Sequence, residues 1–140
     1  PANLLPVIME TATGTRDSMD IYGDDYDTPD GTSIRDYIHV NDLATAHVRA
    51  LYYLIEKNEN LTLNLATGKG YSVLEVIENI QEIIGENINY KIIERRSGDP
   101  AELIAVSKLA NEYLEWKCKY SDIKTILQSM WGIYSKQKLF

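Results

Sequence analysis

Apolar residues recur every three or four positions in several stretches of the chain, which is the spacing of helices that bury one face. Residues 4–12 follow this spacing and stop before Gly14, where a glycine suits the end of a helix. Residues 43–55 follow it over a longer stretch, with Asn41 or Asp42 as the expected cap. Both stretches predict helices with a buried apolar face.

A third helix has both of its ends marked in the sequence. Ser72 and Glu75 stand three residues apart, the spacing at which each side chain caps the other residue's backbone N–H. Apolar residues follow at helical spacing over residues 73–84, and Gly85 ends the pattern. We therefore expect a helix that starts after Ser72 and stops at Gly85.

Other stretches favour extended structure. Residues 19–22 and 90–94 predict short strands, and residues 37–40 a short extended piece. In residues 61–66 leucines alternate with polar or small residues, as in a strand with one buried face.

Two more helices are expected near the end of the chain, over residues 107–114 and 121–134, with Trp116 and Trp131 as large core or interface residues. Helices thus alternate with strands along a chain of 140 residues, which is enough for one domain with a real core. The predicted fold class is α/β.

Acidic residues outnumber basic ones, at 21 Asp and Glu against 14 Lys and Arg, so the net charge is 14 − 21 = −7. Repulsion over most of the surface makes nucleic acid an unfavourable partner. No apolar run approaches the roughly 20 residues that span a bilayer, and the single cysteine, Cys118, fits a reducing compartment. We expect a cytoplasmic protein that binds neither nucleic acid nor membrane.

Two arginine sites carry the most informative chemistry. Arg35 follows a glycine-containing turn, while Arg95 and Arg96 lie far downstream, just before Gly98. A guanidinium is planar and permanently charged, so its donors match phosphate oxygens in a way that lysine does not. From composition alone, salt bridges to the many acidic residues are an equally good account. We expect the two sites to close on one diphosphate-type ligand.

The glycine pair Gly68-x-Gly70 resembles part of a dinucleotide-binding turn, but Val73 stands where a third glycine belongs. No acidic residue closes an obvious following strand about 20 residues further on. A capped turn between a strand and a helix is therefore favoured over a phosphate site.

Metal binding is not favoured either. The acidic stretch 25–30 lacks the oxygen ligands of a calcium loop, since Pro29 occupies its fifth position. His39 and His47 have no partner at ligand spacing and are expected to be structural.

The pattern Tyr-x-x-x-Lys, in which an ammonium can lower the pKa of a phenol, occurs three times. A chain with ten tyrosines produces such matches by chance, and helical spacing brings each pair together in any case. We expect no catalytic residue among them, and read all three as solvated helix faces: Tyr53/Lys57, Tyr113/Lys117 and Tyr134/Lys138.

Four separated blocks of sequence carry a family resemblance. They are Asn3-Leu4-Leu5-Pro6, the stretch from Ile21-Tyr22-Gly23 to Arg35-Asp36-Tyr37-Ile38-His39-Val40, Asn64-Leu65-Ala66-Thr67-Gly68-x-Gly70-x-Ser72-Val73, and Arg95-Arg96-x-Gly98-Asp99-Pro100. In this order, over almost the whole chain, they closely resemble the UDP-glucose 4-epimerases, which are extended short-chain dehydrogenases/reductases.

The resemblance implies that residues 1–140 are the C-terminal substrate-binding part of such an enzyme, with a partial Rossmann-type sheet and helix attached. In that family, bound NAD takes hydride from C4 of the hexose, the 4-keto sugar turns over, and hydride returns to its other face. The NAD-binding glycines and the tyrosine base belong to an N-terminal domain. The chain starts after them, at Pro1 and without an initiator Met, so we expect this part alone to be inactive and to lack the NAD site.

The resemblance also implies three contacts to the sugar and the base. Asn3 matches an asparagine that hydrogen-bonds the diphosphate-sugar, and Leu4 a neighbouring backbone contact. Tyr22 matches an aromatic residue that packs against uracil.

Four further positions lie downstream. Arg35 and Arg96 match two arginines on the diphosphate, and Asp99 matches an acid that accepts hydrogen bonds from ribose hydroxyls. Leu103 stands where the bulk of the side chain decides whether an N-acetyl group at C2 of the hexose fits. Leucine is intermediate in size, so turnover of UDP-N-acetylhexosamines stays open.

The implied ligand is a UDP-hexose, and the implied whole protein is a homodimer. The helix 42–57 and the segment 61–66 would pack on the missing domain, so their exposed apolar faces favour self-association of this part. Two alternatives stay open: a related nucleotide-sugar epimerase or dehydratase, and a UDP-sugar-binding module without chemistry.

Overall fold

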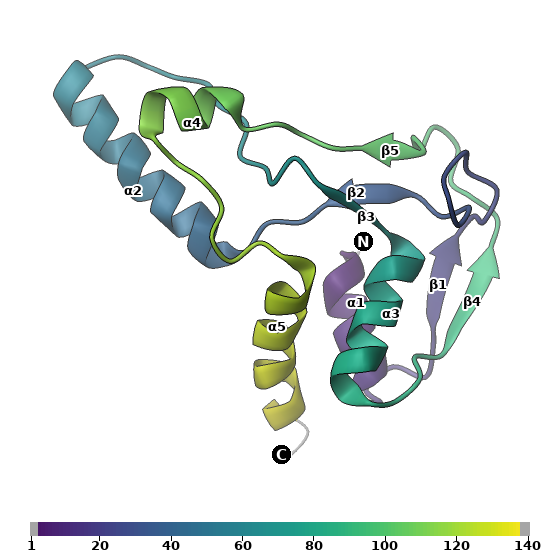
Figure 1. The fold of residues 1–140 in the computed structure, drawn as a ribbon. Coiled ribbons are helices and arrows are strands. Elements are labelled where there is room, and N and C mark those ends of the chain that lie inside the picture. Colours follow the sequence, from purple (N-terminus) through teal and green to yellow (C-terminus); the bar gives the residue numbers. More distant parts are fainter. Residues whose placement is uncertain (1–2, 138–140) are drawn as a thin grey trace.

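The computed structural model describes residues 3–137, and these residues form an α/β fold, as predicted (Figure 1). In chain order its elements are α1 (Leu4–Ala12), β1 (Met19–Tyr22), β2 (Ile34–Asp36), α2 (Val40–Lys57), β3 (Gly70–Ser72), α3 (Val73–Ile84), β4 (Tyr90–Ile93), β5 (Glu102–Leu103), α4 (Lys108–Leu114) and α5 (Ile123–Gln137).

The ends of the helices follow the local signals in the sequence. At α3, the Ser72 Oγ accepts from the Glu75 N–H at 3.0 Å, and the Glu75 carboxylate accepts from the Ser72 N–H at 2.7 Å. Gly85 then ends α3 with φ +73°, and Gly14 follows α1 with φ +72°. Only glycine adopts this left-handed conformation without strain, so these predicted boundaries are confirmed.

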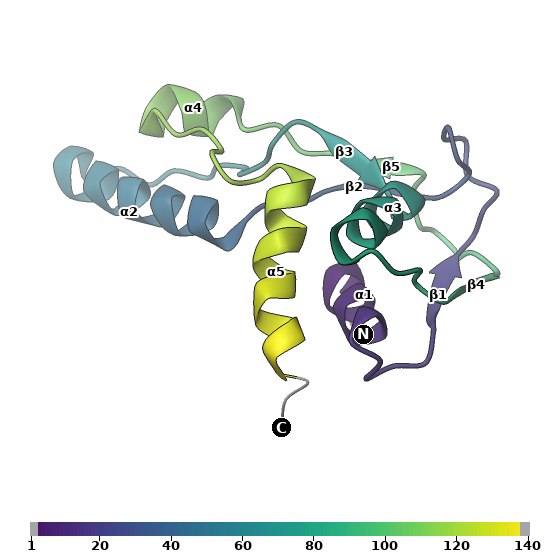
Figure 2. The ribbon, with the colours of Figure 1, turned by 60° about the horizontal axis from the view of Figure 1, so that its bottom comes forward.

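The structure has two hydrophobic cores. The larger one gathers α1, β1, α3 and α5, and its fully buried side chains are Ile8, Met9, Met19, Ile21, Val76, Ile77, Ile80 and Leu127. The smaller one joins α2 to α4 around Ala46, Ala110, Leu114 and Trp116. Figures 1 and 2 show α2 and α4 projecting as an arm from the body that holds the larger core.

The strands form two small sheets. Strands β1 and β4 pair in parallel, with Met19 opposite Tyr90 and Tyr22 opposite Ile93. The other sheet has the order β3-β2-β5, in which β2 runs antiparallel to β3 and parallel to β5. The second sheet connects the arm to the body (Figure 1). Residues of both β1 and β2 line a cavity.

Two expectations need correction. Residues 61–66 form no strand, although their alternation is real: Leu63 and Leu65 pack against the smaller core, while Leu61 is 37% exposed. A strand needs a neighbour for its backbone N–H and C=O groups, and this segment has none among the described residues.

The cap of α2 is also not the predicted one. The helix starts at Val40, and the His39 Nδ1 accepts from the Asn41 N–H at 3.0 Å. The Asp42 side chain points instead to the segment that leads into α5.

This Asp42 carboxylate is buried and joins α2 to α5. It accepts hydrogen bonds from the Lys119 N–H, the Tyr120 N–H and the Ser121 hydroxyl at 3.0, 2.9 and 2.6 Å, while the Trp116 Nε1 donates to its backbone carbonyl at 3.0 Å. Burial raises the pKa of the carboxyl group, but the three donors outweigh burial and hold the pKa below its ordinary value.

We expect Asp42→Asn to destabilise the fold by about 2 kcal/mol at pH 7, because an amide NH₂ would face backbone N–H donors in a buried place. A lowered folded-state pKa stabilises the protein above the ordinary aspartate pKa of about 3.9, and this stabilisation is lost as pH falls through the folded-state pKa.

Urea unfolding of both proteins from pH 7 down to pH 3 measures their free energies of unfolding. The difference between wild type and Asp42→Asn should become smaller toward low pH. Asp27→Asn, at an exposed aspartate, is the control and should change little. If this difference in free energy of unfolding does not change with pH, the ionised Asp42 carboxylate does not stabilise the fold as proposed.

Candidate functional site

A cavity of about 600 Å³ contains both predicted arginine sites. Arg35 and Arg96, which are 61 positions apart in sequence, line it together with Tyr22, Asp99 and Leu4. Its other lining residues are Val7, Arg16, Met19, Asp20, Ile21, Ser33, Tyr37 and Val73. Five of the seven residues that the sequence pointed to therefore share one concave surface.

Strand β1 positions the aromatic wall of this cavity. Met19 and Ile21 are 1% and 2% exposed and belong to the larger core, so Asp20 and Tyr22 turn to the opposite face of the strand. All four residues of the strand line the cavity, and two of them, Met19 and Ile21, also belong to the larger core.

Strand β2 positions Arg35, whose guanidinium is held by three hydrogen bonds. Its Nη1 donates to the carbonyl oxygen of Ile34 at 2.7 Å. Its Nη2 donates to the Asp99 Oδ1 at 2.5 Å and to the Pro100 carbonyl oxygen at 3.0 Å. The side chains of Arg35 and Asp99 are only 24% and 29% exposed, so this ion pair is a partly buried part of the cavity wall.

Arg96 is held differently. Its guanidinium carbon lies 3.7 Å from the centroid of the Tyr22 ring, in a cation–π stack. The neighbouring Arg95 is half exposed, lies 3.7 Å from the Asp25 carboxylate, and is absent from the cavity wall that the described residues form. The two adjacent arginines thus have separate surroundings.

The remaining two predicted residues lie beside the cavity. Asn3 is the exposed N-cap of α1, where its side chain makes no capping hydrogen bond, and it directly precedes the lining residue Leu4. Leu103 lies on β5 opposite Arg35 in the parallel register and is 61% exposed. Neither is among the residues that line the cavity.

The cavity also includes residues that sequence reasoning did not select. Arg16 lies in the loop after α1 and pairs with the Glu10 carboxylate at 2.8 Å. Tyr37 is largely buried, and burial raises the pKa of its phenol to about 12. The alternation of β1 was a usable signal for Asp20, because it shares a face with Tyr22. No local pattern marked Arg16.

The acidic loop 24–32 is structural. Gly31 has φ +79°, and a Cβ there would lie 2.1 Å from the Asp24 carbonyl oxygen, so only glycine fits. The Asp30 carboxylate accepts from the Thr32 N–H and hydroxyl, each at 2.8 Å, and also bonds the Ser72 hydroxyl. Among residues 3–137, no three His, Cys, Asp or Glu side chains gather as a metal site requires.

The turn Gly68–Gly70 does not fit a dinucleotide. A Cβ on Gly70 would meet side-chain atoms of Ile34 and Ile104 at 2.5 Å, so the close approach there is to other side chains. The first N–H groups of α3 are also engaged, because Ser72 accepts from Glu75 and Thr32 accepts from Leu74. A pyrophosphate would therefore find no glycine cradle here, and two of the first N–H groups of α3 already have acceptors.

Of the three Tyr-x-x-x-Lys pairs, Tyr53/Lys57 lies on α2, whereas Lys117 follows the end of α4 at Leu114, so Tyr113/Lys117 is not the predicted helix-face pair. Lys138 of the third pair lies outside the described residues. The histidines take structural roles. The His39 Nε2 lies 3.1 Å from the Ser129 hydroxyl, and the His47 Nδ1 lies 2.7 Å from the Leu43 carbonyl oxygen. Partial burial, together with a hydrogen bond to Glu59, raises the pKa of Tyr53, which is opposite to what a base requires.

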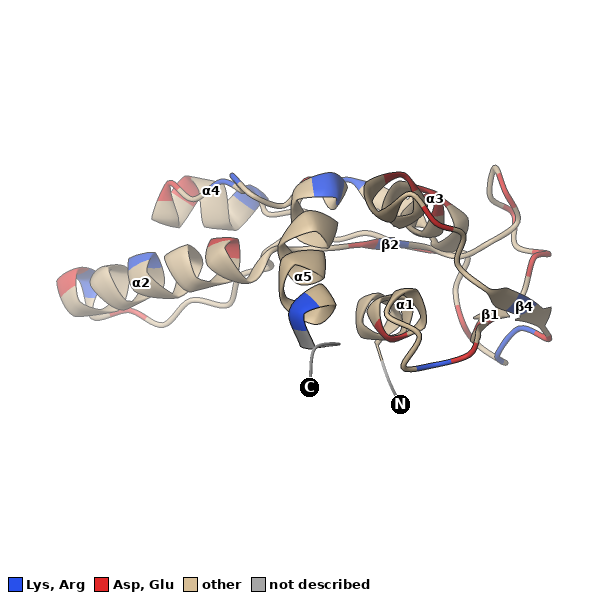
Figure 3. Cartoon of the chain, turned by 90° about the horizontal axis from the view of Figure 1, so that it is seen from below, with Lys and Arg blue, Asp and Glu red and all other residues tan. Residues whose placement is uncertain are grey.

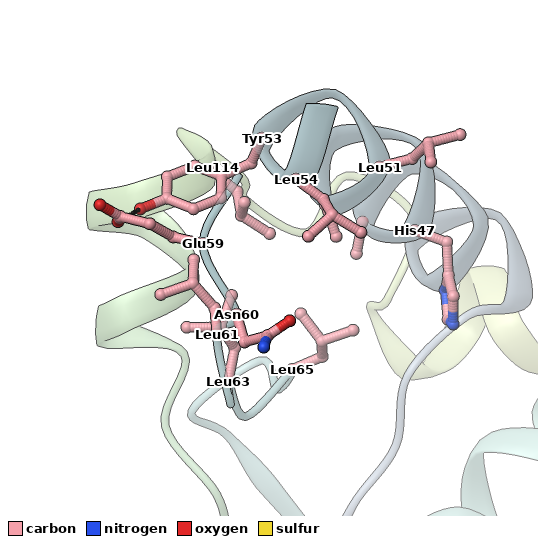
Figure 4. Close-up of a pocket in the computed structure, with 12 residues that line it drawn as sticks. His47, Leu51, Tyr53, Leu54, Glu59, Asn60, Leu61, Leu63, Leu65 and Leu114 are labelled. Atoms are coloured by element: carbon pink, nitrogen blue, oxygen red, sulfur yellow. Dashed lines mark hydrogen bonds between the residues drawn. The ribbon is translucent and has the colours of Figure 1, made fainter. Parts of the chain in front are cut away.

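A second cavity, of about 350 Å³, lies between α2 and residues 59–65 (Figure 4). Half of its twelve lining residues are leucines, including Leu51, Leu54, Leu61 and Leu65. It has no charged pair like Arg35 and Asp99, and so offers apolar contact rather than recognition of an anion.

Basic residues are not concentrated on one element. Figure 3 shows Lys and Arg spread over several elements rather than gathered on one face. None of the helices in residues 3–137 has both the length and the apolar character needed to cross a bilayer.

The chain is similar to one class of enzymes, the NAD dependent epimerase/dehydratase family, whose model matches residues 1–66. Within this class the similarity is to UDP-glucose 4-epimerases. The enzyme of Streptococcus mutans is 45% identical over 133 residues, which are 95% of this chain and 40% of that protein.

Solved structures agree. The UDP-glucose 4-epimerase of Stenotrophomonas maltophila, with bound NAD and formylated UDP-arabinopyranose, has a TM-score of 0.94 at 40% identity, over 99% of this chain and 41% of its own. That of Bifidobacterium longum, in complex with NAD+ and UDP, has a TM-score of 0.86 at 42% identity, over 97% of this chain and 40% of its own. The chain is thus related in sequence and fold to the UDP-glucose 4-epimerases, as its motifs predicted, and spans about 40% of their length.

Proposed function

We propose that the chain is the UDP-sugar-binding portion of an NAD-dependent UDP-hexose 4-epimerase. The observation that carries the proposal is that Arg35 and Arg96 line one cavity with Tyr22 and Asp99. The similar proteins include structures in complex with NAD+ and UDP and with formylated UDP-arabinopyranose, which supports a UDP-sugar as ligand.

In this proposal each cavity residue has a chemical role. Arg35 and Arg96 bind the diphosphate oxygens through charge-assisted hydrogen bonds, and Tyr22 packs against uracil. Asp99 accepts hydrogen bonds from the ribose hydroxyls. Asn3 joins them at the edge of the cavity through its amide.

The hydride chemistry belongs to the whole protein. There bound NAD would supply hydride transfer at C4 of the hexose, and a tyrosine base outside residues 1–140 would act with it. The residues that hold NAD are proposed to lie outside this chain as well. The whole protein is proposed to be a cytoplasmic homodimer.

Two other functions make different predictions. A related nucleotide-sugar epimerase or dehydratase would use the same cavity with another hexose, and the bulk of Leu103 would decide whether an N-acetyl group is accepted. A binding module without chemistry would lack upstream catalytic sequence. Coding sequence upstream of Pro1 that contains Gly-x-x-Gly-x-x-Gly and a Tyr-x-x-x-Lys pair supports the epimerase, and a stop codon there supports the module.

UDP should bind the 140-residue chain weakly. Two charge-assisted arginine contacts contribute roughly 3 to 6 kcal/mol gross, whereas micromolar affinity needs about 8 kcal/mol. We expect Arg35→Ala to reduce UDP affinity about tenfold or more, measured by calorimetric titration at millimolar ligand.

Arg95→Ala is the matched control, since it removes an equal charge beside the cavity and should leave the affinity unchanged. Circular dichroism of Arg35→Ala tests whether loss of its structural hydrogen bonds unfolds the chain. Equal UDP affinities in the wild type and a folded Arg35→Ala would remove Arg35 from the site.

The exposed face of α2 leads to a proposal about assembly. Val48, Leu51, Tyr52 and Ile55 are 54%, 57%, 68% and 71% exposed and recur at helical spacing, so they form one apolar strip. We propose that residues 1–140 alone associate through this strip.

Sedimentation velocity at rising protein concentration should show association, and Ile55→Lys should weaken it. Gln128→Lys, an equal charge change on an exposed position of α5, should not. A compact monomer at every concentration would contradict this proposal.

A further inference from the structure

The cavity holds its three arginines in different ways. Arg35 is held by the Asp99 carboxylate and two backbone carbonyls, and Arg16 by the Glu10 carboxylate. Within the described part of the chain, Arg96 has no carboxylate or carbonyl partner. Its guanidinium lies on the Tyr22 ring instead.

This stack covers one face of the Tyr22 ring. At 3.7 Å from the ring centroid, the guanidinium is at van der Waals contact, so no second planar group fits between it and the ring. Arg96 and Tyr22 both line the cavity, so the stack lies at its wall. A base that packs on this face must displace Arg96.

Displacement has different consequences for different ligands. The stack itself stabilises by a modest amount, because both side chains are partly exposed to water. A bare nucleoside loses this stabilisation on binding and offers the released guanidinium no anionic acceptor. A nucleoside diphosphate brings oxygens that accept the same planar donors at once.

We propose that Arg96, by stacking on Tyr22, makes the site selective for a nucleoside diphosphate over the bare nucleoside. This rests on the proposed function, in which Tyr22 receives the base and Arg96 binds the diphosphate. Recognition of the base and of the phosphates is then coupled through one side chain. Arg96 must therefore have opposite effects on the two affinities: it weakens the binding of a nucleoside and strengthens the binding of a nucleoside diphosphate.

The two neighbouring arginines allow a matched experiment on the 140-residue chain. Uridine and UDP are titrated into wild type, Arg96→Ala and Arg95→Ala, and affinities are measured by NMR chemical-shift changes, which report millimolar binding. Arg96→Ala should bind uridine about threefold more tightly and UDP about tenfold more weakly. Arg95→Ala should bind both ligands like the wild type.

A conservative variant separates stacking from charge. Arg96→Lys keeps a cation but lacks the planar group, so uridine affinity should rise as in Arg96→Ala while part of the UDP affinity is retained. In a Tyr22→Leu background, Arg96→Ala should no longer increase uridine affinity, because there is no ring to uncover. A gain that persists without the ring overturns the inference.

The stack is also measurable without any ligand. The side-chain protons of Arg96 should be shifted upfield by the ring current of Tyr22, and Tyr22→Leu should abolish that shift. An unshifted Arg96 in the wild type overturns the inference directly.

Failure of this inference and failure of the proposed function give different results. If the wild type binds UDP but Arg96→Ala binds uridine no better than wild type, the coupling is wrong and the UDP-sugar site stands. If the wild type binds neither ligand at millimolar concentration, both are overturned. A folded Arg96→Ala with unchanged UDP affinity removes Arg96 from the diphosphate and overturns the coupling as well.

Discussion

The guanidinium of Arg35 joins two parts of the chain that are 64 positions apart, and the geometry of the cavity depends on it. Its Nη2 holds both the Asp99 carboxylate, at 2.5 Å, and the Pro100 carbonyl, at 3.0 Å. The parallel pairing of β2 with β5 continues directly from this contact. These hydrogen bonds use three of the five guanidinium donors, so a phosphate that binds Arg35 would use the Nε and the remaining Nη1 donor of a group that already has an anionic partner. Arg35 consequently has a structural role and a proposed binding role, and only a comparison of stability with affinity separates them.

The sequence predicted the helix ends that are determined by residues close to them in the chain. The capping box of Ser72 and Glu75 and the glycines after α1 and α3 specify helix ends with no help from distant residues, and those ends are confirmed. The two- and three-residue strands β2, β3 and β5 have no such signal, because they exist only through pairing between distant segments. The opposite failure occurred at residues 61–66, where alternation predicted a strand but the described chain supplies no partner.

The same distinction applies to the cavity. The resemblance pointed to Tyr22, and in the structure Tyr22 lies on the exposed side of β1 while Met19 and Ile21 are buried. The pairing of Arg35 with Asp99 did not follow from composition, where any of 21 acidic residues was a possible partner. Family resemblance pointed to both residues, yet only the fold brings them within hydrogen-bonding distance. Arg16 reaches the cavity through the loop after α1, and nothing in its immediate sequence indicates this.

Charge separates the cavity from the rest of the molecule. Its lining residues include three arginines, Arg16, Arg35 and Arg96, and two aspartates, Asp20 and Asp99, so the local balance is 3 − 2 = +1, whereas the chain as a whole carries −7. At physiological ionic strength the field of distant charges is screened beyond about 8 Å, so a small anion inside the cavity interacts mainly with the arginines. A long polyanion would also extend over the acidic surface and meet repulsion there. The proposed ligand, a compact diphosphate, would avoid that repulsion, although it carries the same phosphate chemistry as nucleic acid.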